Sequence, residues 1–158
     1  MRVFNLLDGE TGEGENVDVF VHRRAGVRHH LGGELIGCSL YELPPGKRAW
    51  PYHYHDNNEE WLVVVDGRPT LRTPAGEREL EPGDVAGFPQ GEAGAHDISN
   101  RTGEPVRVAI FSTLRQGSVV YPDSGKVGVF AGWSRTDGQR VQLMNRPEAN
   151  LDYFDGET

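Results

Sequence analysis

Short apolar runs separated by turn residues dominate the middle of the chain, and in several of them apolar and polar side chains alternate. Valines, for example, occupy positions 17, 19 and 21. A period of two is typical of β-strands that bury one face. The pattern predicts strands at residues 17–22, 37–43, 50–55, 60–65, 70–73, 77–80, 84–88, 95–99 and 106–113.

Turn-forming residues separate most of these predicted strands. Pro44-Pro45-Gly46 and Pro82-Gly83-Asp84 are typical of tight turns, and Asp66-Gly67 after an apolar run predicts a hairpin. Helical periodicity is nearly absent, and 21 glycines and 10 prolines make long helices unexpected. The sequence therefore predicts an all-β fold, an antiparallel β-barrel or jelly roll (double-stranded β-helix).

The chain has 158 residues, the length of one domain, and can bury a core without metals or disulfides. We expect a single domain over residues 1–158. Residues 36–115 are expected to be the barrel core that carries the motifs described below, and residues 1–16 and 116–158 are expected to form arms, edge strands or tails. A metal ion in such a chain is expected to serve function rather than folding.

Charge and targeting signals exclude several classes of partner. The chain carries 24 acidic and 16 basic side chains, a net charge of −8, with no basic cluster to neutralise phosphates. No apolar run is long enough for a signal peptide or a membrane span, and Cys38 is the single cysteine. We expect a cytoplasmic protein that binds neither nucleic acid nor membranes.

Two histidines stand two residues apart in one predicted strand. His53 and His55 would share a face, because side chains at i and i+2 of a strand point the same way. The strand that opens with Glu59-Glu60 is predicted to run antiparallel beside them, which would bring one carboxylate back. His96, in another predicted strand, could add a third nitrogen.

Three imidazoles and one carboxylate suit a divalent transition metal and leave coordination positions open for substrate. The ions compatible with this donor set are Fe, Mn, Ni, Cu, Co and Zn. The other histidines, His22, His29 and His30, are predicted to be exposed, on a strand or in a solvated loop, with no role in the site.

The order and spacing of these residues resemble the two motifs of the cupin superfamily. The first motif is filled by Gly46, His53-Tyr54-His55, Glu60 and Gly67. The spacing to Gly67 selects Glu60 rather than Glu59. The second motif is filled by Gly83, Pro89-Gln90-Gly91, His96 and Asn100. Two loop spacers are longer here than in the family pattern.

The resemblance implies a small β-barrel that holds one divalent metal through His53, His55, Glu60 and His96, and it implies a homodimer. It leaves the reaction open, because cupins include dioxygenases, isomerases, lyases and binding proteins. One carboxylate against a divalent ion leaves a charge of +1, which suits a small anionic substrate that chelates through two oxygens. We expect an enzyme of dioxygenase, isomerase or lyase type, or alternatively a non-catalytic small-molecule-binding module. No separate catalytic acid or base is indicated.

Overall fold

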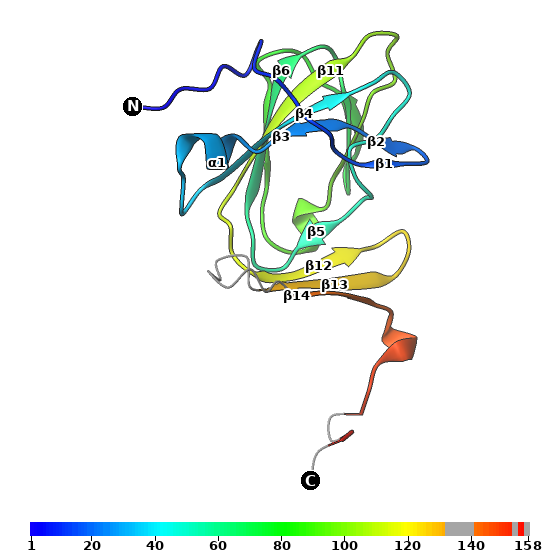
Figure 1. The fold of residues 1–158 in the computed structure, drawn as a ribbon. Coiled ribbons are helices and arrows are strands. Elements are labelled where there is room, and N and C mark those ends of the chain that lie inside the picture. The colour runs from blue at the N-terminus through cyan, green and yellow to red at the C-terminus, as the bar shows by residue number, and fades with distance from the viewer. Residues whose placement is uncertain (132–140, 153–154, 157–158) are drawn as a thin grey trace.

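The all-β prediction is confirmed by a computed structural model, which describes residues 1–131, 141–152 and 155–156. Antiparallel sheets curve around a common interior (Figure 1). The helices of this part of the chain are short: α1 (Val27–Leu31), η1 (Glu92–Gly94) and η2 (Pro147–Ala149). None of the helices described is long and apolar enough to cross a membrane.

The largest sheet has five strands in the order β3-β4-β11-β6-β9. Their bounds are β3 Arg23–Ala25, β4 Gly37–Leu43, β11 Val106–Ser112, β6 Glu60–Asp66 and β9 Val85–Phe88. The central strand, β11, pairs with both β4 and β6, with a register shift against β6 between Arg107 and Val108, and Ile110 has Ser39 on one side and Leu62 on the other.

Three smaller sheets complete the structure. They have the orders β10-β7-β8, β14-β13-β12-β5 and β1-β2. Their bounds are β10 Asp97–Ser99, β7 Thr70–Thr73, β8 Gly76–Glu79, β14 Val141–Asn145, β13 Lys126–Ala131, β12 Gly117–Tyr121, β5 Tyr54–His55, β1 Asn16–Val17 and β2 Phe20–Val21.

The hairpin predicted at Asp66-Gly67 is wrong. β6 pairs with β9 and β11, whereas β7 pairs with β8 and β10, so the turn carries the chain from one sheet to another. Gly67 has a φ of 77°, and a Cβ there would lie 2.7 Å from Val106 Cγ1. The glycine therefore allows both a left-handed turn and a close approach to β11.

Residues beyond 116, where arms, edge strands or tails are expected, include three strands. β12 pairs with β5 and β13, and β13 pairs with β14, which places this sheet beside the histidine-bearing segment (Figure 1). The parts of that expectation that fall on residues 132–140, 153–154 and 157–158 lie outside the described residues.

The inward positions of the central strands change from apolar to polar along their length. On β11, Val106 and Val108 are fully buried, and Ser112 lines a cavity. On β6, Val64 and Leu62 are buried, and the next inward position is Glu60. One end of the barrel is therefore a packed core, and the other end is open and polar.

Asn100, the last residue of the second motif, holds the turn between β10 and β11 at the packed end. Its buried side-chain amide donates to Leu43 O at 3.0 Å and Glu104 O at 2.7 Å. Its Oδ1 accepts from Thr102 N and Thr102 Oγ1 at 2.9 and 2.7 Å.

We expect Asn100→Ala to lower the free energy of unfolding by about 2–4 kcal/mol, because it removes the side-chain donor to Leu43 O, one of the two donors to Glu104 O, and the acceptor for Thr102. Urea denaturation measures the loss, and Arg101→Ala, which removes only an exposed ion pair with Glu77, serves as the control. A loss no larger than that of Arg101→Ala would contradict this role.

Candidate metal centre

Glu60 begins β6 and points into the open end of the barrel. It lies opposite Phe88 on β9 and Ser112 on β11. Its Oε1 accepts a hydrogen bond of 3.3 Å from Asn58 Nδ2, and Asn58 Oδ1 accepts one of 2.8 Å from Thr113 Oγ1. Asn58 therefore orients the carboxylate, a role that the sequence analysis does not predict because Asn58 is not one of the motif residues.

His53 and His96 are joined by their backbones. An isolated antiparallel bridge links them, with His53 N donating to His96 O at 3.1 Å and His96 N to His53 O at 2.8 Å. Each ring also donates from Nδ1 to the carbonyl two residues earlier, at 2.9 Å, to Pro51 O and Gly94 O respectively. Both rings therefore carry the proton on Nδ1, and the lone pair of each ring lies on Nε2.

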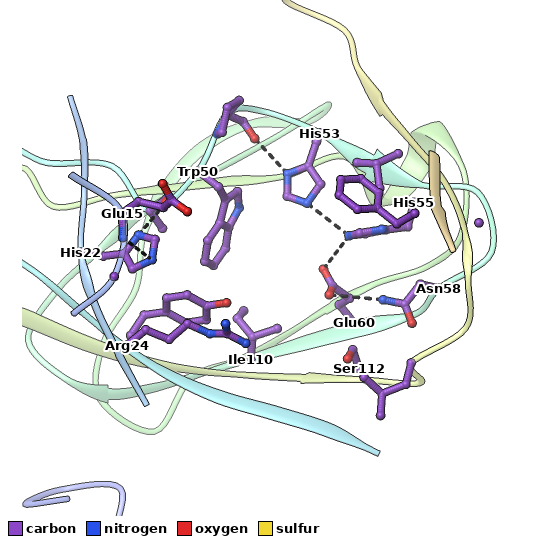
Figure 2. Close-up of a pocket in the computed structure, with 18 of the residues that line it drawn as sticks. Glu15, His22, Arg24, Trp50, His53, His55, Asn58, Glu60, Ile110 and Ser112 are labelled. Carbon is purple, nitrogen blue, oxygen red and sulfur yellow. Dashed lines mark hydrogen bonds and ion pairs between the residues drawn. The ribbon is translucent and has the colours of Figure 1, made fainter. Parts of the chain in front are cut away.

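The donor atoms of three predicted ligands converge. One ligand atom from each of His53, Glu60 and His96 lies within 4.8 Å of the others. His55 Nε2 adjoins this group, at 3.2 Å from His53 Nε2 and 3.2 Å from Glu60 Oε2 (Figure 2). The structure thus brings all four sequence-predicted residues together.

The strand pairing that was predicted to bring Glu60 beside the histidines is wrong. The histidine-bearing strand β5 pairs with β12, where Val119 faces His55, and not with β6. Glu60 reaches the histidines from across the barrel interior instead of from the adjacent strand. The strand predicted over residues 50–55 is also shorter, because only Tyr54–His55 form a ladder.

Aromatic rings hold the imidazoles in place. Phe88 stacks on His96 at 3.8 Å between ring centroids with an interplanar angle of 4°, and Tyr121 stacks on His53 at 5.9 Å. Trp50 presents an edge-type contact to both imidazoles at 6.2 and 6.1 Å. The rings are therefore positioned by packing as well as by hydrogen bonds.

Burial and mutual contact set the protonation states of the site. Burial, together with the neighbouring His96 and His55, lowers the pKa of His53 to about 3, and burial also lowers the pKa of His96. Burial raises the pKa of Glu60, but the hydrogen bond from His55 and the electrostatic interaction with the neighbouring imidazoles outweigh it, so the net shift is downward. At neutral pH the site therefore presents His53 and His96 as neutral imidazoles and Glu60 as an ionised carboxylate, the forms that bind metals.

Several buried side-chain atoms have no hydrogen-bond partner in the described part of the chain, and one of them belongs to a predicted ligand. His96 Nε2 has no hydrogen bond within the described part of the chain, and Glu60 Oε2 is 3.5 Å from it. An unpartnered buried nitrogen lone pair costs free energy unless another group meets it. The residues therefore fit a divalent metal, which would accept the lone pairs of the imidazoles and the charge of the carboxylate.

A cavity of about 950 Å³ extends from this group across the barrel interior. His53, His55 and Glu60 line one end, and His22 and Arg24 line the other (Figure 2). The cavity wall between the two ends includes Trp50, Tyr41 and Ile110. A ligand at the metal group therefore has room to extend well beyond it.

The prediction that His22 is exposed is wrong. Its side chain is buried, with Nδ1 3.0 Å from Ala49 O and Nε2 accepting from Glu15 N at 3.4 Å. Burial lowers its pKa. The N-terminal segment that covers His22 is distant from Ala49 in sequence, so the alternation pattern gives no sign of this burial.

The loop predicted around His29 and His30 is also wrong, because both belong to α1. Both side chains are exposed and neither lines the cavity, in agreement with their exclusion from the site.

Comparison with known proteins identifies the family. The Cupin domain family model matches residues 39–114. A solved protein from Acidithiobacillus ferrooxidans, named as a candidate sugar phosphate isomerase, is 30% identical with a TM-score of 0.67, over 78% of this chain and 76% of that one. No curated protein sequence matches the chain. The chain belongs to the cupin superfamily, as its motifs predict.

Two further solved structures share the fold at lower identity. A sugar phosphate isomerase of the cupin superfamily from Silicibacter pomeroyi is 22% identical with a TM-score of 0.78, over 97% of this chain and 98% of that one. A polyketide cyclase from Streptomyces resistomycificus is 19% identical with a TM-score of 0.61, over 75% and 83% of the two chains.

The lowered histidine pKa values predict a pH-dependent stability for the metal-free protein. The ordinary pKa of histidine is 6.5 and that of folded His53 is about 3, so between these values the unfolded chain binds more protons than the folded chain. The free energy of unfolding should therefore fall as the pH drops below about 6.5, with His53 alone contributing about 2 kcal/mol of loss between pH 7 and pH 5.

Urea denaturation of the metal-free protein across this pH range measures the slope. His53→Gln, which cannot titrate there, should show a shallower slope than the wild type, whereas His30→Gln should match it. Equal slopes for the wild type and His53→Gln would contradict the assignment of a buried, neutral imidazole.

Proposed function

We propose that this protein is a metal-dependent enzyme that isomerises a small phosphorylated sugar. The observation that carries the proposal is the group of His53, Glu60 and His96 donor atoms at one end of an open cavity. The names of two similar structures, one a candidate sugar phosphate isomerase and the other a sugar phosphate isomerase, favour this reaction over the other cupin chemistries.

His53, His55, Glu60 and His96 would hold one divalent transition metal. When bound, this ion supplies Lewis-acid chemistry that polarises a substrate carbonyl and stabilises negative charge on its oxygen. The chain supplies one carboxylate, ionised because the pKa of Glu60 is lowered, so the centre keeps a net positive charge that favours an anionic substrate.

The cavity wall supplies shape and a hydrogen-bond donor. Trp50 and Ile110 present apolar surface that excludes water from a bound ligand. Burial raises the pKa of Tyr41, so its hydroxyl keeps its proton at neutral pH and can donate to a substrate oxygen. Tyr41 would thereby orient the substrate.

Removal of one ligand should abolish metal binding. We expect about one equivalent of a divalent transition metal in protein purified without a chelating tag, and an affinity at least about 100-fold lower in His96→Ala. Elemental analysis and competition with a chromogenic chelator measure both. His30→Ala is the matched control, since His30 is exposed, does not line the cavity, and contacts Val3 O and the Phe4 ring. Equal metal binding by wild type and His96→Ala would contradict the assignment.

Isomerisation through proton abstraction beside a carbonyl should exchange a carbon-bound hydrogen with solvent. We expect metal-loaded protein in D₂O to interconvert an aldose phosphate and a ketose phosphate with deuterium incorporation, as seen by NMR. His55→Ala should lose this activity and His30→Ala should keep it.

The non-catalytic alternative makes the opposite prediction. A panel of sugar phosphates that raise the melting temperature of the metal-loaded protein but remain unconverted for hours would favour a small-molecule-binding module. Oxygen consumption with no deuterium incorporation would place the protein with the dioxygenase-type cupins instead.

A further inference from the structure

Arg24 on β3 lies across the cavity from the metal group. It is paired with Tyr41 in the sheet, and its guanidinium carbon is 5.7 Å from the centroid of the Tyr41 ring. Nε and Nη2 both donate to Ser39 Oγ, at 3.3 and 2.8 Å. Figure 2 shows the side chain running into the cavity toward Ile110. The guanidinium is therefore anchored by a neutral hydroxyl and an aromatic ring.

No carboxylate in the described part of the chain forms an ion pair with Arg24. Several other arginines do: Arg68, Arg72 and Arg101 each lie within 2.8 Å of a carboxylate oxygen. Apart from its contacts with Ser39 and the Tyr41 hydroxyl, the guanidinium makes no side-chain hydrogen bond to the described residues, so its charge and remaining donors face the cavity. Such a fork is suited to a phosphate or carboxylate.

The strand register shows how far the residue that anchors Arg24 lies from the strand that carries Glu60. Ser39, which anchors the guanidinium, is level with Ile110 and Leu62, and Glu60 is the next inward position after Leu62. Two strand spacings separate Ser39 from Leu62, roughly 10 Å. This gap, in a cavity of about 950 Å³, exceeds what a two-oxygen chelate fills.

The same end of the cavity also carries Arg28 and the carboxylates of Glu13, Glu15 and Glu34. Arg28 uses its Nε for Gly33 O, at 2.9 Å. The carboxylates oppose the entry of a free anion, so an anion gains from Arg24 chiefly when its other end is held at the metal group, where its effective concentration is high. The carboxylates can also accept hydrogen bonds from hydroxyl groups of a sugar chain.

We propose that Arg24, positioned by Ser39 and Tyr41, binds the phosphate group of a substrate whose opposite, oxygen-chelating end is held at His53, Glu60 and His96. The inference rests on the proposed function for the chelating end, and it adds the binding site for the phosphate. The substrate class is then a linear sugar phosphate with the carbonyl and the phosphate at opposite ends.

The test compares two sugar acids that differ only in the phosphate, arabinonate and 5-phosphoarabinonate, both of which chelate through an α-hydroxy carboxylate. Isothermal titration calorimetry with metal-loaded protein gives each Kd. We expect the phosphorylated acid to bind the wild type about 10- to 100-fold more tightly. Arg24→Gln should reduce that ratio to near one while leaving the metal content and the Kd of arabinonate unchanged.

Arg23→Gln is the matched control, because it removes the same charge from the adjacent residue, which donates to Thr11 O and does not line the cavity. It should keep the wild-type ratio. Arg24→Lys, which keeps the charge but loses the fork, should give an intermediate ratio and serves as a second test if Arg24→Gln melts at a lower temperature.

The outcomes separate the two proposals. A preference for the phosphorylated acid that survives unchanged in both Arg24→Gln and Arg24→Lys would overturn the inference, as would equal binding of the two acids to the wild type. Equal binding would leave the chelating site intact. Failure of both acids to bind the metal-loaded wild type would overturn the proposed function together with the inference.

Discussion

The backbone bridge between His53 and His96 is the constraint on which the site depends. It joins two segments that belong to different motifs and holds both imidazoles at one point. Each ring is then oriented in the same way, by a hydrogen bond from Nδ1 to the carbonyl two residues earlier. Gly94 makes the second of these possible, because a Cβ there would lie 1.8 Å from Pro89 O. The two lone pairs therefore face a common point before any ion arrives, which reduces the free energy spent on ordering ligands.

The apolar core at the packed end of the barrel offsets the free-energy cost of the polar groups at the open end. Leu62, Val64 and Val108 are buried on the same strands that present Glu60 and Ser112 to the cavity. Apolar burial on one half of each strand stabilises the sheet. The open end of the barrel can therefore hold the neutral imidazoles of His53 and His96, the ionised Glu60, and Arg24, which forms no ion pair with a carboxylate in the described part of the chain.

The sequence predicts the elements and the ligands better than it predicts their pairing. Strand periodicity locates most strands, and motif spacing selects Glu60 over Glu59, because both signals are local. The partner of a strand depends on contacts between distant residues, so the Asp66-Gly67 hairpin and the pairing of β5 with β6 are wrong. His22 and Arg24 follow the same rule: an alternating strand pattern does not indicate which residues the N-terminal segment covers or which face a cavity. The homodimer and the cytoplasmic location stay predictions.

The most direct test of the convergent site is the tautomeric state of its histidines, measured by long-range ¹H–¹⁵N NMR on metal-free protein at pH 7. We predict that His53 and His96 are neutral and carry the proton on Nδ1. One equivalent of Zn²⁺ should shift their Nε2 resonances and leave the resonances of His22, His29 and His30, which are not proposed ligands, unchanged. Protonation on Nε2 in either ring, or Nε2 resonances that ignore added zinc, would contradict a preformed metal centre.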